Sequence, residues 1–201
     1  LLTLDGVQVA ACHRFKDYLT IRNTGDIKLL SGYTEGLFQV QDESSGLAVR
    51  LLDPQPGETI IDVCSAPGGK TTYISHLQKD QGHIIACDFA PKRLRRVRAH
   101  CQRLQLENVS VIAMDGCRPG LNIQADRVLI DAPCSGMGTI ARRADLRWRR
   151  QPEDIPAVQR VQKALLDSSA YLVKTGGTLV YSTCSIETEE NEDVLEYFCK
   201  R

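Results

Sequence analysis

Residues 59–75 read TIIDVCSAPGGKTTYIS, and this stretch decides the fold. Its β-branched apolar start predicts a strand over 59–63, and the residues from Lys70 onward predict a helix. Between them, Pro67-Gly68-Gly69 allow a tight turn and let a ligand approach bare backbone, which is typical of a cofactor loop. The spacing fits neither G-x-x-x-x-G-K-[ST] nor G-x-G-x-x-G, so ATP and nicotinamide sites are disfavoured. A plain strand-to-helix turn is the alternative.

Short apolar runs and helical patterns alternate through the rest of the chain. Such alternation predicts an α/β fold, a Rossmann-like and mostly parallel twisted sheet with helices on both faces. The further strands are expected at 83–87, 109–114, 127–131 and 178–182. The helices are expected at 70–77, 91–104, 157–173 and 188–198, with an amphipathic pattern at 43–52 before the first strand.

Polar residues follow the predicted strands at the edge where such sheets bind ligands. They are Asp62, Asp88, Asp115, Asp131 and the run 182–184. Each acid alone could simply accept hydrogen bonds from loop amides, but four acids on one edge favour a polar cofactor. Asp88, at the end of the second strand, can accept both hydroxyls of a ribose.

Composition limits the partners and the compartment. The 201 residues carry 25 basic and 25 acidic side chains, so a nucleic acid would have to be attracted by local basic patches. The eight cysteines form no C-x-x-C pair and no histidine cluster accompanies them, so no metal site is expected. No leader and no bilayer-length apolar run is visible, which favours a cytoplasmic protein without membrane contact. A monomer is expected.

Two cysteines lie in loops at the predicted ligand edge. The motif DAPCSGMG at 131–138 carries Cys134, and YSTCS at 181–185 carries Cys184. A thiolate is a strong nucleophile, and its pKa falls near a cation such as Lys70 or near backbone amides. The more ordinary role of a small buried apolar residue is expected for the others. They include Cys12, Cys87, Cys101, Cys117 and Cys199.

Four motifs in order resemble one enzyme family. DVCSAPGGK, ACDFAPKRL, DAPCSGMG and YSTCSIETEEN together are similar to the RNA cytosine-5 methyltransferases of the NOL1/NOP2/Sun family, over roughly residues 38–198. Within it, FQVQDESSGLAV and the basic stretch ARRADLRWRR favour the bacterial 16S rRNA branch, the RsmB (Fmu) type.

The resemblance implies a role for each matching residue. The cofactor is S-adenosylmethionine, with its methionine end wrapped by the first loop. That loop comprises Cys64, Ser65, Ala66, Pro67, Gly68, Gly69 and Lys70. Asp88 takes the ribose with support from Arg93, Asp115 lies near the adenine, and Asp131 faces both cofactor and base. Cys184 is the nucleophile, and Cys134 assists product release.

The chemistry explains why these residue types are needed. Cytosine C5 is too weak a nucleophile to accept a methyl group directly, but a thiolate adding to C6 makes C5 electron-rich. Asp131, oriented by Lys70, is the candidate for a proton or strong hydrogen bond at N3. Cys134 or a water then removes the C5 proton. The base must also be unstacked, which favours single-stranded or remodelled RNA, with 16S rRNA the expected substrate.

Charged stretches flank these motifs. Five cations within residues 92–98 cannot share one helix face, and part of this run is expected to be ordinary solvated surface. The cluster 142–150 pairs arginines with Trp148 and favours phosphate and base contacts, with core packing of Trp148 the alternative. The acidic run 187–193 opens a helix and is expected to cap it and hold the Cys184 loop.

The chain is expected to be a fragment with two parts. Residues 1–40 are interpreted as the remnant of an upstream RNA-binding or linker region, and residues 41–201 as the catalytic domain with its last strands missing. Two other functions stay open: a methyltransferase acting on tRNA or on a non-RNA substrate, and a catalytically silent RNA-binding module.

Overall fold

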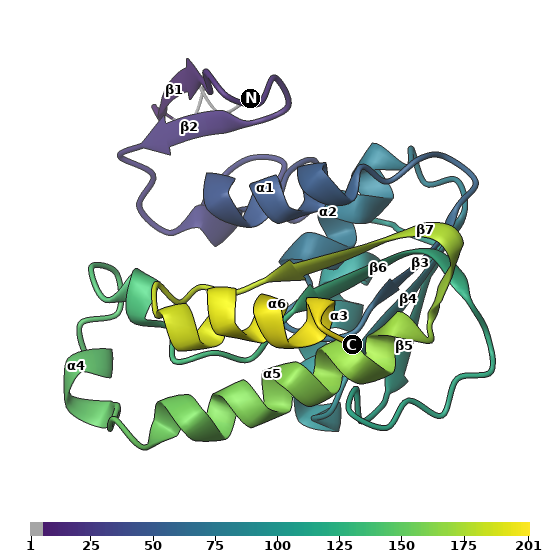
Figure 1. Cartoon of the computed structure of the whole chain (residues 1–201). Coiled ribbons are helices and arrows are strands. Elements are labelled where there is room, and N and C mark those ends of the chain that lie inside the picture. The colour runs from purple at the N-terminus through teal and green to yellow at the C-terminus, as the bar shows by residue number, and fades with distance from the viewer. Residues whose placement is uncertain (1–5) are drawn as a thin grey trace.

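The computed structural model describes residues 6–201. Its main feature is a five-stranded sheet in the order β5-β4-β3-β6-β7, in which every neighbouring pair is parallel (Figure 1). The strands are β3 (Thr59–Asp62), β4 (His83–Asp88), β5 (Val109–Ala113), β6 (Ala125–Asp131) and β7 (Val173–Ser182). The predicted Rossmann-like α/β class is confirmed.

Helices cover both faces of the sheet, as predicted. One face carries α1 (Glu43–Leu52), α2 (Gly69–Leu77) and α3 (Pro91–Arg103). The other carries α5 (Asp154–Ala170) and α6 (Glu192–Cys199). The short helices η2 (Met137–Thr139) and α4 (Leu146–Arg149) lie in the loop after β6. None of the helices in the described part combines the length and apolar character needed to cross a membrane.

The core forms on each face because successive strand residues point to opposite sides. Ile60 packs with α1 and α2, whereas Ile61 packs in the cluster that contains Leu165 and Leu166 of α5. Ile61 pairs with Ile85 and Val128 in the register, and these three side chains lie together on one face, whereas Ile60, Ile84 and Leu129 belong to the cluster on the other. Strands buried in this way read as nearly continuous apolar runs.

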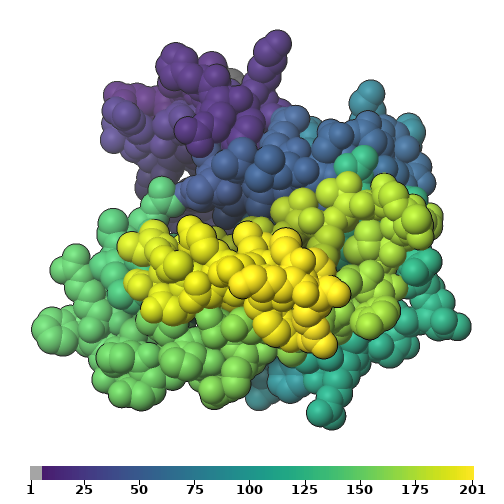
Figure 2. Space-filling model, viewed as in Figure 1, coloured from purple at the N-terminus to yellow at the C-terminus, as the bar shows by residue number. Residues whose placement is uncertain are grey.

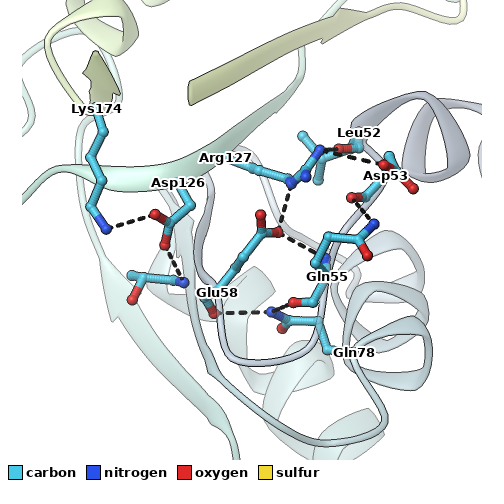
Figure 3. Close-up of polar contacts among 9 residues, drawn as sticks. Leu52, Asp53, Gln55, Glu58, Gln78, Asp126, Arg127 and Lys174 are labelled. Atoms are coloured by element: carbon cyan, nitrogen blue, oxygen red, sulfur yellow. Dashed lines mark hydrogen bonds and ion pairs between the residues drawn. The ribbon is translucent and has the colours of Figure 1, made fainter. Parts of the chain in front are cut away.

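A polar cluster joins the helices to the sheet at the amino ends of the strands (Figure 3). Arg127 donates to Glu58 at 2.6 Å and also bonds the carbonyl of Leu52 at the end of α1. Gln78 donates to the carbonyl of Glu58 at 2.9 Å. This cluster fixes the end of the sheet opposite the ligand edge.

The residues before α1 form a hairpin that packs on the first helical layer. It pairs β1 (Gln8–Ala11) with β2 (Leu19–Arg22) in antiparallel register, and η1 (Ile27–Leu29) follows. The Tyr18 hydroxyl lies where a side chain at Gly46 would be, and it donates to Gln41 at 2.6 Å. In the space-filling view the hairpin sits over α1 (Figure 2).

Some predicted boundaries are wrong for identifiable reasons. The helix expected over 157–173 spans 154–170, because Val173 already belongs to β7. The helix expected over 188–198 is interrupted at Asn191, whose φ of −119° and ψ of −88° separate η3 (Thr188–Glu190) from α6. The strands β6 and β7 begin earlier than predicted, and a register irregularity lies between Ala125 and Arg127.

Candidate active site

The loop after β3 brings glycine backbone to the carboxyl edge of the sheet. Gly68 has a φ of 113°, which favours glycine, and an added Cβ would lie in tight contact, 3.1 Å from the Cα of Val97. Ser65 donates its backbone N–H to the carbonyl of Cys87 at 2.7 Å. The Ser65 hydroxyl is buried and has no hydrogen-bond partner within residues 6–201.

Asp62 lies fully buried beneath this loop. Its carboxylate accepts from Thr71 Oγ1 at 2.7 Å, and its other oxygen has no partner within the described residues. Burial raises its pKa to about 7, and the Thr71 hydrogen bond opposes the shift. Sequence reasoning placed Asp62 at the edge but gave it no role.

Asp88 holds the loops together at the end of β4. It is 2% exposed and accepts from the backbone N–H groups of Ala66 and Ala90, at 3.3 and 2.9 Å. Arg93 pairs with it at 3.2 Å and donates to the carbonyl of Ala66 at 2.8 Å. Asp88 therefore satisfies loop amides, the structural alternative considered for the acids of this edge. The ribose-binding role stays a prediction.

Asp115 stands apart from the other predicted residues. It is exposed after β5 and accepts from the backbone N–H of Cys117 at 2.9 Å. Within residues 6–201 no hydrogen bond or ion pair joins it to the other predicted site residues, and its place near the adenine stays a prediction.

Lys70 and Asp131 meet at the centre of the edge. The Lys70 ammonium lies 2.6 Å from Asp131 Oδ2, with Lys70 14% and Asp131 35% exposed. The Ser182 hydroxyl donates to the other oxygen of Asp131 at 3.0 Å. The predicted contact between Lys70 and Asp131 is confirmed, and Ser182 joins it because β6 and β7 are register neighbours at this point.

The two motif cysteines come together beside this pair. Their Sγ atoms lie 3.0 Å apart, and the backbone N–H of Cys184 points at the Cys134 sulfur at 3.3 Å. Gly138 allows the two loops to touch, because an added Cβ would lie 2.9 Å from the carbonyl oxygen of Cys184. The carboxyl ends of adjacent parallel strands thus deliver both thiols to one place.

The electrostatics separate Cys184 from the buried thiols. The hydrogen bond from Cys134 lowers the pKa of Cys184 to about 7 against the opposing effect of burial, and Arg143 and Lys70 add to the lowering. The same pairing and burial raise the pKa of Cys134. Burial raises the pKa of Cys87 to about 12 and that of Cys101 to about 11. Cys184 is thus the thiol prepared to act as a thiolate.

Glu190 holds both cysteine loops from below. This fully buried carboxylate accepts from the backbone N–H of Ser135 at 2.8 Å, from the Ser185 hydroxyl at 2.6 Å and from Gln162 at 2.9 Å. Burial raises its pKa, but these hydrogen bonds outweigh burial and the net pKa is lowered. The expectation that the acidic run holds the Cys184 loop is confirmed for Glu190. The part played by Gln162 has no signal in the sequence.

The basic cluster divides into inward and outward side chains. Arg150 turns inward and donates to the carbonyls of Ser135 and Cys134 at 2.8 and 3.2 Å. Arg142 contacts Asp42, at the start of α1. Trp148 is 86% exposed, so the core-packing alternative is wrong. The segment around α4 projects from the body of the molecule (Figure 2).

The other cysteines follow the ordinary pattern only in part. Cys87 and Cys101 are buried, and Cys12 and Cys117 are partly so. Cys199 is exposed, so the prediction of a buried residue is wrong there. It ends the last helix, α6.

Comparisons with known proteins point to one family. The family described as 16S rRNA methyltransferase RsmB/F matches residues 49–201. A probable ribosomal RNA small subunit methyltransferase B from Synechocystis is 48% identical over 178 residues, 87% of this chain and 40% of the relative. Its counterpart from Proteus mirabilis is 39% identical over 201 residues, 98% of this chain and 47% of the relative. The chain thus spans less than half the length of these two curated relatives.

A solved structure shares both sequence and fold. NSun6 from Pyrococcus horikoshii, crystallised with the S-adenosylmethionine analogue SFG, superposes with a TM-score of 0.81 at 37% identity. The match covers 87% of this chain and 45% of that protein.

Proposed function

This chain belongs to the 16S rRNA methyltransferase RsmB/F family, and on that premise we propose that it methylates carbon 5 of a cytosine in RNA through a covalent adduct between Cys184 and C6. The observation that carries the proposal is the pair of thiols 3.0 Å apart beside the ion pair of Lys70 and Asp131. A protein or small-molecule methyltransferase has no evident use for two such thiols.

The loop from Cys64 to Lys70 is the proposed holder of S-adenosylmethionine, the cofactor of this family. The glycine backbone, the Asp88 carboxylate and the buried Ser65 hydroxyl, which has no partner in the described part of the chain, fit a ligand with amino, carboxylate and ribose groups. When bound there, this cofactor supplies an electrophilic methyl group. Asp115, exposed after β5, stays the proposed residue near the adenine.

Cys184 supplies the nucleophile. With a pKa of about 7, a large share of this exposed thiol is ionised at neutral pH. Its thiolate adds to C6 of the cytosine, and the ring electrons move toward N3 while C5 becomes nucleophilic. Cys134 holds the thiolate through a hydrogen bond until the base arrives.

Asp131 is the proposed partner of the cytosine N3 edge. Lys70 and Ser182 each bond one of its oxygens, so its orientation is set before the substrate binds. When it holds a proton, which it shares with Lys70 across their 2.6 Å contact, Asp131 can donate a hydrogen bond to N3 and stabilise the negative charge that develops on the ring without further reorganisation. After methyl transfer, a base takes the C5 proton, the C6–S bond breaks and Cys184 leaves as a thiolate. The base is a water, or Cys134 once it has given its own proton to solvent after Cys184 has bonded to C6.

The substrate is proposed to be 16S rRNA, in keeping with the names of the relatives. Trp148 and the exposed arginines of the α4 segment, Arg143, Arg147 and Arg149, are suited to stack on a base and to contact phosphates next to the two thiols. The target base must leave its stack to reach Cys184.

The test is to incubate the chain and its C184S variant with methyl-labelled S-adenosylmethionine and unmodified 16S rRNA, then digest the RNA and quantify 5-methylcytidine. Label in 5-methylcytidine with the unaltered chain and none with the variant is expected. Label in another nucleoside, or equal label with C184S, would contradict the proposal.

A further inference from the structure

One face of α3 carries positive charges that make no contact with acidic groups in the described part of the chain. The helix contains six cations and no acid, although the whole chain is neutral. Lys92, Arg95 and Arg96 are exposed, and within residues 6–201 none of them makes a hydrogen bond or an ion pair. The helix buries Leu94, Val97 and Cys101, and at 3.6 residues per turn these three cations lie on the opposite, outward side.

The same charges destabilise the helix that carries them. Lys92 stands three and four positions before Arg95 and Arg96, the spacings at which like charges repel on a helix surface. Lys92 and Arg93 also lie in the first turn, where the helix dipole favours acids, and no acid is present there. Arg93 is accounted for by Asp88, but the outward three have no such partner. An arrangement that costs the fold stability indicates an anionic partner outside the chain.

The position of the helix identifies the partner. α3 follows directly from the end of β4, so its first turn lies at the carboxyl edge of the sheet, the same edge that carries Cys184 after β7. β4 lies three strand spacings from β7, roughly 14 Å along the sheet. An extended single strand with its target base at Cys184 would cover that span in a few nucleotides.

We propose that Lys92, Arg95 and Arg96 form a second RNA-binding surface, which contacts the phosphates of the strand a few nucleotides away from the target cytosine. This rests on the proposed function for the identity of the strand, but it concerns a different face from the α4 segment. The surface adds affinity without touching the reacting base, because phosphate contacts position a strand and carry no sequence information.

The test compares the triple variant K92Q/R95Q/R96Q with a control of equal charge change, R160Q/K174Q/K200Q, in which Arg160 is on α5, Lys174 is on β7 and Lys200 directly follows α6. The binding of a fluorescein-labelled single-stranded RNA of about 20 nucleotides is measured by anisotropy from about 50 to about 200 mM salt. The α3 variant is expected to bind at least tenfold more weakly at low salt, with a log–log salt slope less steep by about 2, the loss of three single-strand phosphate contacts. The control is expected to have the same salt slope as the unaltered chain.

If the three cations stabilised the fold, their removal would lower the melting temperature; the proposal predicts that it does not. The α3 variant is expected to have a melting temperature equal to or above that of the unaltered chain, because repulsion has been removed. Equal salt slopes for the two variants would overturn the proposal, and so would a binding loss explained by unfolding. An acidic protein as the true partner would also leave the RNA slope unchanged and overturn it.

The outcome is separable from that of the proposed function. If the unaltered chain forms no 5-methylcytidine but the α3 variant still loses affinity and slope, the function is wrong and the surface stands. If 5-methylcytidine forms and the slope is unchanged, the surface is wrong and the function stands.

Discussion

The Sγ atoms of Cys134 and Cys184 lie 3.0 Å apart, although fifty positions separate the residues in the chain. Two thiols at this distance share a proton, so deprotonation is a property of the pair. The structure favours Cys184 as the site of the charge, since its pKa is lowered to about 7 and that of Cys134 is raised.

We expect the alkylation of Cys184 by iodoacetamide to follow this pKa. The rate should rise with pH through about 7 and level off above it, because the thiolate is the reactive form. In C134A the largest cause of the lowering is lost, and the midpoint should move upward toward the value of about 8.5 for a free thiol. Mass spectrometry of the peptide that contains Cys184 measures the rate, and C184S identifies the peptide. An unchanged midpoint in C134A would rule out the hydrogen bond as the cause.

Lys70 and Asp131 are expected to act as one unit in catalysis. D131N should reduce the single-turnover rate of methyl transfer by about 10²- to 10⁴-fold, the usual contribution of a positioned acid or base. K70M should reduce this rate by a smaller factor. The double variant should reduce it by much less than the product of the two single factors, because Lys70 acts through Asp131. Strictly multiplicative losses would show that the 2.6 Å contact has no catalytic meaning.

Glu190 is expected to stabilise the cysteine loops in a pH-dependent way. E190Q replaces one of the two accepting oxygens with an NH2 group and removes the charge that strengthens all three hydrogen bonds, and should lower the free energy of unfolding at pH 7 by about 1–3 kcal/mol. The net pKa is lowered in the folded state, so this stabilisation is present above the unfolded pKa of about 4.3 and is lost as pH falls through the folded pKa.

Urea unfolding at pH 7 and near pH 3 checks this sign. The difference in the free energy of unfolding between the unaltered chain and E190Q should be smaller at the lower pH. E189Q, at the exposed neighbour, is the control and should change little at either pH. A difference that grows on acidification would mean that Glu190 is not held as a carboxylate.

Trp148 is expected to matter for RNA and not for the fold. Its side chain is 86% exposed, so W148A should change the free energy of unfolding by less than about 0.5 kcal/mol. Loss of a stacking platform costs about 1–3 kcal/mol of binding, or roughly five- to 150-fold in affinity for single-stranded RNA. Y171A removes an equally exposed aromatic residue at the end of α5, next to the start of β7, and should leave RNA affinity unchanged. Equal effects of the two variants would argue against a specific contact.

The sequence predicts the fold and the meeting of the two thiols for one physical reason. In a parallel sheet the carboxyl ends of all strands lie at one edge, so a motif after β6 and another after β7 must be neighbours. The same logic brings Lys70, at the start of α2, to Asp131. Here periodicity and topology suffice, because the positions follow from backbone geometry.

Side-chain direction within long loops follows from no such rule. Arg150 and Trp148 stand two residues apart in one basic cluster, yet Arg150 turns inward to the Cys134 loop and Trp148 stands in solvent. The hydrogen bonds of Gln162 with Pro133 and Glu190 depend on how α5 packs across the sheet, and the sequence carries no periodic signal for them. The break at Asn191 is likewise set by the contacts of its side-chain amide with Ser185 and Glu187.

Asp62 provides a prediction that links the buried layer of the site to stability. Burial raises its folded pKa to about 7, above the unfolded value of about 3.9. Between these two values the folded state holds a proton that the unfolded state has lost. Stability therefore falls as pH rises through this window, and above pH 7 the folded chain carries a buried carboxylate, one oxygen of which has no partner among residues 6–201.

The amide side chain introduced in D62N cannot ionise, so this variant should not lose stability in this way as the pH rises. Its free energy of unfolding, relative to the unaltered chain, should rise by about 2–4 kcal/mol between pH 5 and pH 8, an upper range set by the pKa difference. Urea unfolding at both pH values measures it, and taking the difference removes the contributions of groups that both proteins share. D115N, at an exposed acid on the same edge, should show no such divergence. Parallel stability curves for D62N and the unaltered chain would mean that Asp62 titrates as an ordinary carboxylate, and that the loop above it does not rest on a protonated acid.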